Sequence, residues 1–426
     1  MIRILLFLYN YILIPILSFY FKFNYKLNRD EIISDFYKII KKNNYTAKRI
    51  WFHSSSMGEF EQVKYIIELL KKEQSNIEII CTFFSNSGYE NQKNYHYADY
   101  IAYLPVDSKK NAKKFIEIVN PSLAIFVRYD LWLNFLINLK RKNIPSLLIN
   151  ATYPKIYKNK IIFKIIKSYY TYTYSLISEI FAVNDESFKF FKNELHYKNV
   201  YQSKDTRLDR IAENVEQSKN YDILPKEIIN SETATLVAGS TWEKDIELLS
   251  KMLREINKDN FLLRAIIVPH KPEKDKLVQI ENLIPNSIRL SNIENLDKNQ
   301  LSNFKEHHLI VDKIGILLKL YKYADIAYVG CGFGDGVHST AEPAGYGLPI
   351  ITGPNIYNSP DATELHKIGA LQIIKNEKEL INWTTKLLSD KSLSNIIREK
   401  SKKYIEENKG FSLKITKYII EKLTKN

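Results

Sequence analysis

The feature that most constrains the fold of this chain is a regular alternation of short apolar runs with amphipathic helical patterns. The apolar runs are rich in Ile, Val, Leu and Phe and too short for helices, which is typical of buried strands. Strands that alternate with helices indicate parallel sheets built from βαβ units. We expect strands at 49–52, 77–82, 100–104, 123–127, 146–149, 181–183 and 200–202, and again at 235–238, 263–268, 308–311, 326–329 and 348–351.

A polar stretch separates these two series of strands, and a chain of 426 residues usually forms more than one core. The predicted fold is therefore α/β, with two Rossmann-like, doubly wound domains that face a cleft. Ligands of such sheets bind outside the carboxyl ends of the strands. The predicted segments are a membrane anchor at 1–22, a first domain at 23–215, a linker at 216–232, a second domain at 233–411 and a helix at 412–426 that crosses back to the first domain.

The N-terminal segment 4–21 is apolar except for one asparagine and one serine. Its length is close to the lower limit, about 17 residues, for a membrane-spanning helix. Basic residues follow it at Lys22, Lys26 and Arg29 and are scarcer before it, which by the positive-inside rule keeps the main body in the cytoplasm. We expect a membrane anchor or a helix deep in the bilayer interface. The alternatives are a buried core helix and a signal peptide, although no small-residue cleavage site follows.

A second stretch with membrane character runs from 150 to 180, where lysines alternate with aromatic residues and Glu179 is the only acid. Basic amphipathic helices with aromatic side chains lie in bilayer interfaces, and each lysine near anionic lipid adds about 1 kcal/mol. We expect this surface to contact membrane lipid; the alternative is an ordinary solvated helix. Its basic residues include Lys155, Lys158, Lys164 and Lys167.

The net charge of +14 favours anionic partners, but nucleic acid is not expected because no recognition motif accompanies the charge. Cys81 and Cys331 lie far apart in the sequence. They offer neither a disulfide framework nor zinc spacing, which fits a reducing compartment.

The first motif whose side chains could take part in catalysis is WFHSSSMGE at 51–59, where an expected strand runs into a polar turn and a helix. Glu59 falls in the first helical turn. One interpretation is a helix-end charge, which contributes about 0.3–1 kcal/mol to stability. The other is a general base at the mouth of the cleft, which accepts the proton of an attacking hydroxyl.

Two further motifs follow strands of the second series. PHKPEK at 269–274 is either a solvated loop or a site for a ligand's phosphate or carboxylate. In the stretch 328–344, every second residue from 330 to 336 is a glycine, and a helix is expected to begin near Ser339 or Thr340. Free amides at that helix start can bind an anion, and Glu342 can bind ribose hydroxyls. The alternative is a glycine-rich turn with a Ser/Thr cap and no ligand.

These motifs, in this order, resemble the 3-deoxy-D-manno-octulosonic acid (Kdo) transferases over nearly the whole chain. Further matches lie at 127–134, 150–151, 205–209, 238–241 and 311–315. The resemblance implies a GT-B fold with an N-terminal membrane segment at the cell inner membrane and catalytic domains on the cytoplasmic side. It implies transfer of Kdo from CMP-Kdo to a lipid A precursor, lipid IVA, in lipopolysaccharide biosynthesis.

By the same resemblance, Glu59 is the general base of an inverting reaction, Asp130 organises the reacting centre and Arg207 balances the charge of the donor. No metal or other cofactor is implied, because CMP departs with the help of cations and helix amides. Asp130 and Arg207 stand where the family commonly has Glu and Lys. The implied donor contacts are Pro269, His270, Ile314, Gly315, Ile316, Ser339, Thr340, Ala341 and Glu342.

Two other functions are compatible with the same pattern. One is a GT-B transferase or epimerase that uses a UDP-sugar. The other is a catalytically inactive, membrane-bound GT-B binding protein. The presence of Glu59, of the glycine-rich motif and of Glu342 argues against an inactive protein.

Overall fold

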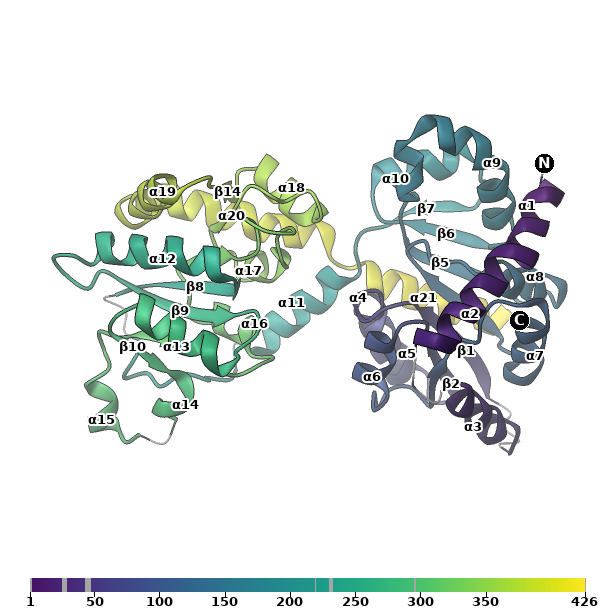
Figure 1. Cartoon of the computed structure of the whole chain (residues 1–426), viewed down its shortest axis with the longest axis horizontal. Coiled ribbons are helices and arrows are strands. Elements are labelled where there is room, and N and C mark those ends of the chain that lie inside the picture. Colours follow the sequence, from purple (N-terminus) through teal and green to yellow (C-terminus); the bar gives the residue numbers. More distant parts are fainter. Residues whose placement is uncertain are drawn as a thin grey trace. The chain divides into compact units, whose positions relative to one another are not determined.

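The computed structural model describes residues 2–24, 29–42, 47–218, 220–229, 233–294 and 296–425. The chain divides into two compact units: unit 1 comprises Met1–Asp209 and Lys409–Asn426, and unit 2 comprises Arg210–Asn408. Each unit contains a seven-stranded sheet in which the paired strands are parallel (Figure 1). The predicted α/β class with two parallel sheets is confirmed. The predicted cleft stays a prediction.

The sheet of unit 1 has the strand order β3-β2-β1-β4-β5-β6-β7. Successive strands are added toward one edge up to β3 and toward the other edge from β4 on, so the order of addition reverses between β1 and β4. Ligands of doubly wound sheets bind at this reversal, outside the carboxyl ends of the strands. Alternate side chains of β1 face opposite sides, so Trp51 and Phe52 belong to different apolar clusters. The strands are β1 (Lys48–Ser54), β2 (Ile77–Phe83), β3 (Tyr100–Tyr103), β4 (Leu123–Val127), β5 (Ser146–Ala151), β6 (Glu179–Ala182) and β7 (Val200–Gln202).

Helices cover both faces of this sheet. The cluster that contains Trp51 is built with α3 (Arg29–Lys42), α7 (Lys109–Val119), α8 (Leu133–Arg141) and α9 (Lys160–Ser175). The cluster that contains Phe52 is built with α5 (Lys64–Glu73) and with α21 (Phe411–Lys425), which is yellow in Figure 1. Apart from the N-terminal helices described below, the other helices of unit 1 are α4 (Met57–Phe60), α6 (Asn86–Gln92), η2 (Lys155–Lys158), α10 (Asp185–Lys189) and η3 (Phe190–Glu194). The helix α11 (Arg207–Ser218) begins in unit 1 and continues into unit 2.

The sheet of unit 2 has the order β10-β11-β9-β8-β12-β13-β14 and reverses between β8 and β12. Its strands are β8 (Ala234–Thr241), β9 (Leu263–Pro269), β10 (Ser287–Arg289), β11 (His308–Ile310), β12 (Ile326–Val329), β13 (Ile350–Thr352) and β14 (Leu371–Ile373). Its helices are α12 (Glu243–Ile256), α13 (Lys274–Leu283), α14 (Leu290–Ile293), α15 (Lys298–Ser302), α16 (Leu317–Leu320), η4 (Tyr321–Tyr323), α17 (Ala341–Gly345), α18 (Pro360–Lys367), α19 (Glu377–Ser389) and α20 (Lys391–Asn408).

The compact units differ slightly from the predicted segments. Residues 210–215, assigned from the sequence to the first domain, belong to unit 2. The reason is packing: Ile211 and Val215 of α11 lie against Gly345, and the Ser218 hydroxyl is 2.5 Å from the Tyr346 hydroxyl. Residues 219 and 230–232 of the predicted linker lie outside the described residues.

The N-terminal segment is helical throughout its described part, as α1 (Ile2–Leu8), the π-helical η1 (Tyr9–Leu13) and α2 (Ile14–Asn24). Met1, the first residue of the predicted anchor, lies outside the described residues. Within the part of the chain that is described, none of the helices has both the length and the apolar character needed to cross a membrane.

One side of this segment packs on unit 1. Tyr9 and Ile14 are buried, the Tyr9 hydroxyl donates to Asp107 Oδ2 at 2.5 Å, and Asn134 Nδ2 donates to Asn10 Oδ1 at 2.9 Å. Asp107 also accepts the backbone N–H groups of Asn134 (3.0 Å) and Phe135 at the start of α8. The N-terminal helix is thereby tied to the first turn of α8.

Candidate active site

Glu59 lies on the short helix α4, which follows the carboxyl end of β1 at the reversal point of unit 1. Its side chain folds back, and Oε2 accepts the backbone N–H groups of Ser55 (2.7 Å) and Ser56 (3.2 Å). The residue is only 7% exposed. Burial, and after it the negative charge of Asp130, raises the pKa of Glu59 above its ordinary value, against the effect of the two amides. A buried carboxylate of raised pKa suits a general base.

Asp130 follows β4, the strand beside β1, and the structure brings its side chain to the loop that precedes Glu59. Its Oδ2 lies 2.8 Å from His53 Nε2 and accepts hydrogen bonds from the Ser55 hydroxyl and from Trp132 Nε1 (3.3 Å). Burial acts to raise the pKa of Asp130, but the hydrogen bond and charge of His53 outweigh it and hold that pKa below its ordinary value.

His53 also belongs to this cluster. It lies in the motif at 51–59, but no role was predicted for it. It is fully buried on β1, with Nδ1 at 3.2 Å from the Thr82 carbonyl oxygen and 2.9 Å from the Thr82 hydroxyl. The carbonyl can only accept, which favours a proton on Nδ1. On the other side of the ring, Nε2 lies 2.8 Å from Asp130 Oδ2, and the Trp132 indole N–H donates to this nitrogen at 3.0 Å. The cluster is therefore a hydrogen-bonded imidazole–carboxyl pair next to Glu59.

Arg207 begins α11 and pairs with Asp205, donating from Nε at 2.9 Å and from Nη2 at 2.6 Å. Burial acts against ionisation of Asp205, but the Arg207 charge outweighs it and lowers the pKa of that carboxyl. The loop is held next to the Glu59 turn, because Thr206 donates its N–H to Asn150 Oδ1 at 3.2 Å and its hydroxyl to the Gln62 carbonyl. Arg207 thus carries an internal counter-ion, which the sequence did not predict.

The predicted donor residues of unit 2 follow three strands of its sheet, β9, β11 and β12. Pro269 is the last residue of β9, and the His270 N–H donates to the Thr241 carbonyl at 3.1 Å. The glycine-rich loop approaches β8 closely, since a Cβ on Gly330 would lie 2.4 Å from the Ser240 carbonyl oxygen. This close approach requires glycine.

The residues that follow the glycine-rich loop differ in exposure. Thr340 is fully buried, and in the described part of the chain its hydroxyl has no hydrogen-bond partner. Ala341 is buried, Ser339 is exposed, and Glu342 is half-buried within the electrostatic reach of Tyr321. These residues start α17, which has only five residues and therefore a smaller dipole than the expected helix.

The third donor segment precedes α16. Ile314 is 84% exposed, Gly315 has φ +86°, and Ile316 is the N-cap residue of the helix. The left-handed backbone at Gly315 favours glycine. An exposed isoleucine beside such a turn is available for contact with a ligand base.

The predicted lysine surface is less basic than the sequence suggests. Lys158 and Lys164 are exposed, but Lys167 forms an ion pair with Glu194 at 3.6 Å. The side chain of Lys155 lies outside the described residues. The pairing was not foreseen because Glu194 comes from η3, in a different segment.

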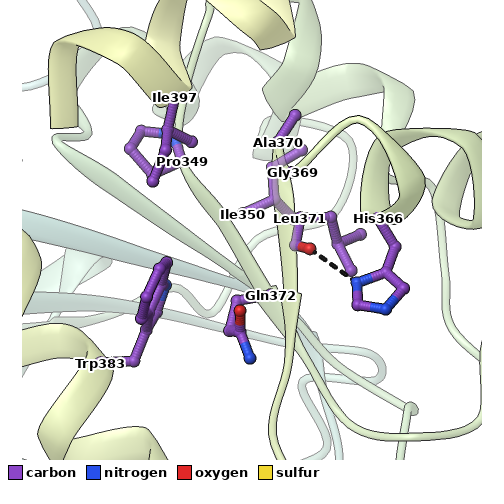
Figure 2. A pocket seen from close by; sticks show the side chains of 9 residues that line it. All are labelled: Pro349, Ile350, His366, Gly369, Ala370, Leu371, Gln372, Trp383 and Ile397. Carbon is purple, nitrogen blue, oxygen red and sulfur yellow. Dashed lines mark hydrogen bonds between the residues drawn. The ribbon is translucent and has the colours of Figure 1, made fainter. Parts of the chain in front are cut away.

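A separate cavity lies at the amino ends of β13 and β14, where Ile350 and Leu371 begin these strands (Figure 2). In Figure 2, Trp383 faces it and His366 Nδ1 bonds to the Leu371 carbonyl oxygen at 3.0 Å. None of the predicted site residues lines it. The cavity is therefore distinct from the strand ends that carry the candidate site.

Comparison with known proteins identifies relatives of this chain. Residues 32–210 match the family described as "3-Deoxy-D-manno-octulosonic-acid transferase (kdotransferase)". A 3-deoxy-D-manno-octulosonic acid transferase from Aquifex aeolicus is 30% identical over 369 residues, which is 85% of this chain and 93% of the relative. A protein of the same description from Chlamydophila psittaci is 28% identical over 75% of this chain and 72% of its own length.

Solved structures support the fold alone. UDP-GlcNAc 2-epimerase from Neisseria meningitidis aligns with a TM-score of 0.60 at 16% identity, over 89% of this chain and all of its own. MurG from Acinetobacter baumannii aligns with a TM-score of 0.55 at 11% identity, over 88% of this chain and 99% of its own. The relatives place the chain in the family of 3-deoxy-D-manno-octulosonic acid transferases, which are glycosyltransferases, and the solved structures agree with a fold of the GT-B type.

Proposed function

We propose that this protein transfers Kdo from CMP-Kdo to a lipid A precursor, lipid IVA, by one inverting displacement in which Glu59 is the general base. The observation that carries the proposal is the environment of Glu59: a buried carboxylate of raised pKa, fixed by two backbone amides beside the Asp130–His53 pair. Such a carboxylate is oriented and is a stronger base than an exposed one.

In the proposed reaction, Glu59 takes the proton of the acceptor hydroxyl as that oxygen attacks the anomeric carbon of the donor. The bond between this carbon and the phosphate oxygen breaks, and its electron pair leaves with CMP. Since both amides bind Oε2 of Glu59, we assign Oε1 to the acceptor hydroxyl. Asp130, held by His53 and Ser55, keeps a negative charge near Glu59 and so raises its basicity.

The donor nucleotide is assigned to unit 2, at Pro269, His270, Ile314–Ile316 and Ser339–Glu342. The buried Thr340 hydroxyl supports this assignment, because a buried polar group without a partner costs about 1–3 kcal/mol unless a ligand satisfies it. Glu342 is placed to accept hydrogen bonds from ribose hydroxyls.

Attachment to the cytoplasmic side of the inner membrane is assigned to the N-terminal helix together with α9, which α1 contacts. Large apolar side chains are exposed on both: Ile4 (64%), Phe7 (57%) and Ile16 (59%) on the N-terminal segment, and Ile161 (79%) and Ile165 (60%) on α9. Adjacent exposed apolar side chains with lysines nearby are typical of helices that lie in a bilayer interface.

The test is to incubate the purified chain with CMP-Kdo and lipid IVA and to analyse the lipid by mass spectrometry. We expect a mass increase by whole Kdo units with release of CMP, and an inverted anomeric configuration by NMR. UDP-sugars are offered in parallel. Release of UDP with no release of CMP contradicts the proposal, and donor binding without turnover favours a binding protein.

A further inference from the structure

Three aromatic rings lie together at the carboxyl ends of β8, β9 and β12. Trp242 stacks on His270, with ring centroids 4.9 Å apart and planes 20° from parallel. His270 stacks in turn on His338, at 4.7 Å and 21°. Trp242 is 44% exposed, His270 is exposed and His338 is half-buried, so one side of this ring cluster faces solvent. Neither Trp242 nor His338 has a role in the site described above.

One contact indicates which tautomer of His338 is present. Trp242 Nε1 lies 3.5 Å from His338 Nε2. An indole N–H can only donate, so Nε2 is the acceptor and the neutral ring carries its proton on Nδ1. The two nitrogens therefore share a single hydrogen in this state.

Burial and a neighbouring ring make it harder for His338 to take up a proton. Burial, followed by the neighbouring His270, lowers the pKa of His338, and Asp245 of α12 acts in the opposite direction. The carboxylate of Asp245 is already engaged, since it accepts the backbone N–H groups of Trp242 (2.9 Å) and Cys331 (3.0 Å) and the Tyr328 hydroxyl (2.7 Å). Asp245 thus holds in place the two loops that carry Trp242 and His338. An anion bound beside His338 would add the negative charge that favours protonation of its ring.

We propose that the phosphate of the bound nucleotide makes His338 take a proton from solvent onto Nε2, so that His338 and Trp242 then donate two adjacent N–H groups to phosphate oxygens. This inference rests on the proposed use of a nucleotide donor. In the reaction, the phosphate oxygen that leaves the sugar gains the electron pair of the broken bond. Two fixed donors beside it stabilise that charge as it develops. Trp242 and His338 then stabilise the departing CMP.

The test is isothermal titration calorimetry of CMP into the full chain, near neutral pH, in buffers of different ionisation enthalpy. The phosphate of CMP is itself mostly doubly charged there, since its second pKa is about 6. We expect CMP to bind with uptake of up to about one proton, and its affinity to fall by up to about tenfold per pH unit as pH rises. Cytidine, which lacks the phosphate, should bind without proton uptake.

Variants separate the proposed proton site from its surroundings. His338→Gln keeps an N–H donor but cannot take up a proton, so CMP should bind with uptake near zero and with affinity independent of pH. Trp242→Phe keeps the stack and removes the N–H, so uptake should persist while affinity falls several-fold. His366→Gln, in the separate cavity of Figure 2, is the control and should behave as the parent.

The outcomes are distinguishable. CMP binding without proton uptake, or uptake that survives in His338→Gln, overturns the inference and leaves the proposed function intact. A parent protein that binds neither CMP nor CMP-Kdo overturns both. Should His338→Gln melt far below the parent, the pH dependence of the parent and the response of Trp242→Phe still decide.

Discussion

Replacing Glu59 by glutamine is the most direct test of the proposed chemistry, because the change removes the basic carboxylate and little else. The amide oxygen of Gln can still accept the N–H groups of Ser55 and Ser56, now at 2.7 and 3.2 Å from Glu59 Oε2. The variant should therefore keep the turn between β1 and α4.

Its effect on stability follows from the raised pKa. A carboxyl whose folded pKa exceeds its unfolded value contributes stability below the unfolded pKa, ordinarily 4.5 for Glu59, and loses it as pH rises through the folded pKa. At neutral pH the buried charge is thus a net cost that Gln removes. Against this, each hydrogen bond from a backbone N–H group weakens from about 1.5–3 to about 0.5–1.5 kcal/mol when its acceptor becomes neutral. These effects oppose each other, so we expect a melting temperature within about 4 °C of the parent.

Its effect on rate should be far larger. Loss of a general base lowers turnover by roughly 10²–10⁴-fold, which is about 2.7–5.4 kcal/mol of transition-state stabilisation. Melting temperature, CMP affinity and single-turnover rate should be measured on one preparation. Glu61→Gln, two residues away and paired with Lys64, is the matched control and should keep its rate. A Glu59→Gln protein that is stable and fully active refutes the assignment of the base, though not the fold.

Three further changes test other parts of the molecule. Asp130→Asn removes a negative charge that raises the pKa of Glu59, so the acid limb of kcat/KM against pH should move to lower pH; a limb that does not move contradicts the coupling. Burial raises the pKa of Asp107 from 3.8 to about 7, so its contribution to stability is lost as pH rises through about 7. The melting temperature should fall as pH rises from about 4 to about 7 and level off above that, and Asp107→Asn should flatten this dependence. Ile161→Asp with Ile165→Asp should weaken binding to anionic liposomes at least about tenfold, because two apolar contacts become anionic.

The liposome experiment needs a control for net charge. Lys244→Glu with Lys258→Glu changes the charge more, at exposed positions of unit 2. These substitutions should leave liposome binding nearly as in the parent. Equal loss in both double variants indicates a general effect of charge and contradicts the assigned surface.

The sequence predicted the strands that lie inside each sheet and missed the two at the edges of the second sheet. β10 (Ser287–Arg289) and β14 (Leu371–Ile373) have three residues each and stand at opposite ends of the strand order. An edge strand pairs on one side only and is partly exposed, so it needs no continuous apolar run. The pattern that revealed the central strands is therefore absent there.

In the candidate site, the sequence predicted features that depend on neighbouring residues and missed those that depend on contacts between distant segments. Glu59 was predicted because strand, polar turn and helix follow one another in the sequence. His53 became visible only when β1 paired with β4, which placed Asp130 at 2.8 Å and Trp132 at 3.0 Å from its ring. The pairs Arg207–Asp205 and Lys167–Glu194 likewise depend on side-chain directions that periodicity does not encode.

The return of the C-terminus to unit 1 has a consequence for how the protein forms during synthesis. Ile415, Ile419 and Leu423 of α21 are buried in the same cluster as Phe52 of β1, and Asp209 accepts the Ser412 N–H at 2.7 Å. Unit 2 lies wholly between these parts of the chain. On the ribosome, unit 2 can close its core while one face of the first sheet still lacks its last helix. A chain that ends before α21 should therefore retain a folded unit 2 and aggregate through the uncovered face of unit 1.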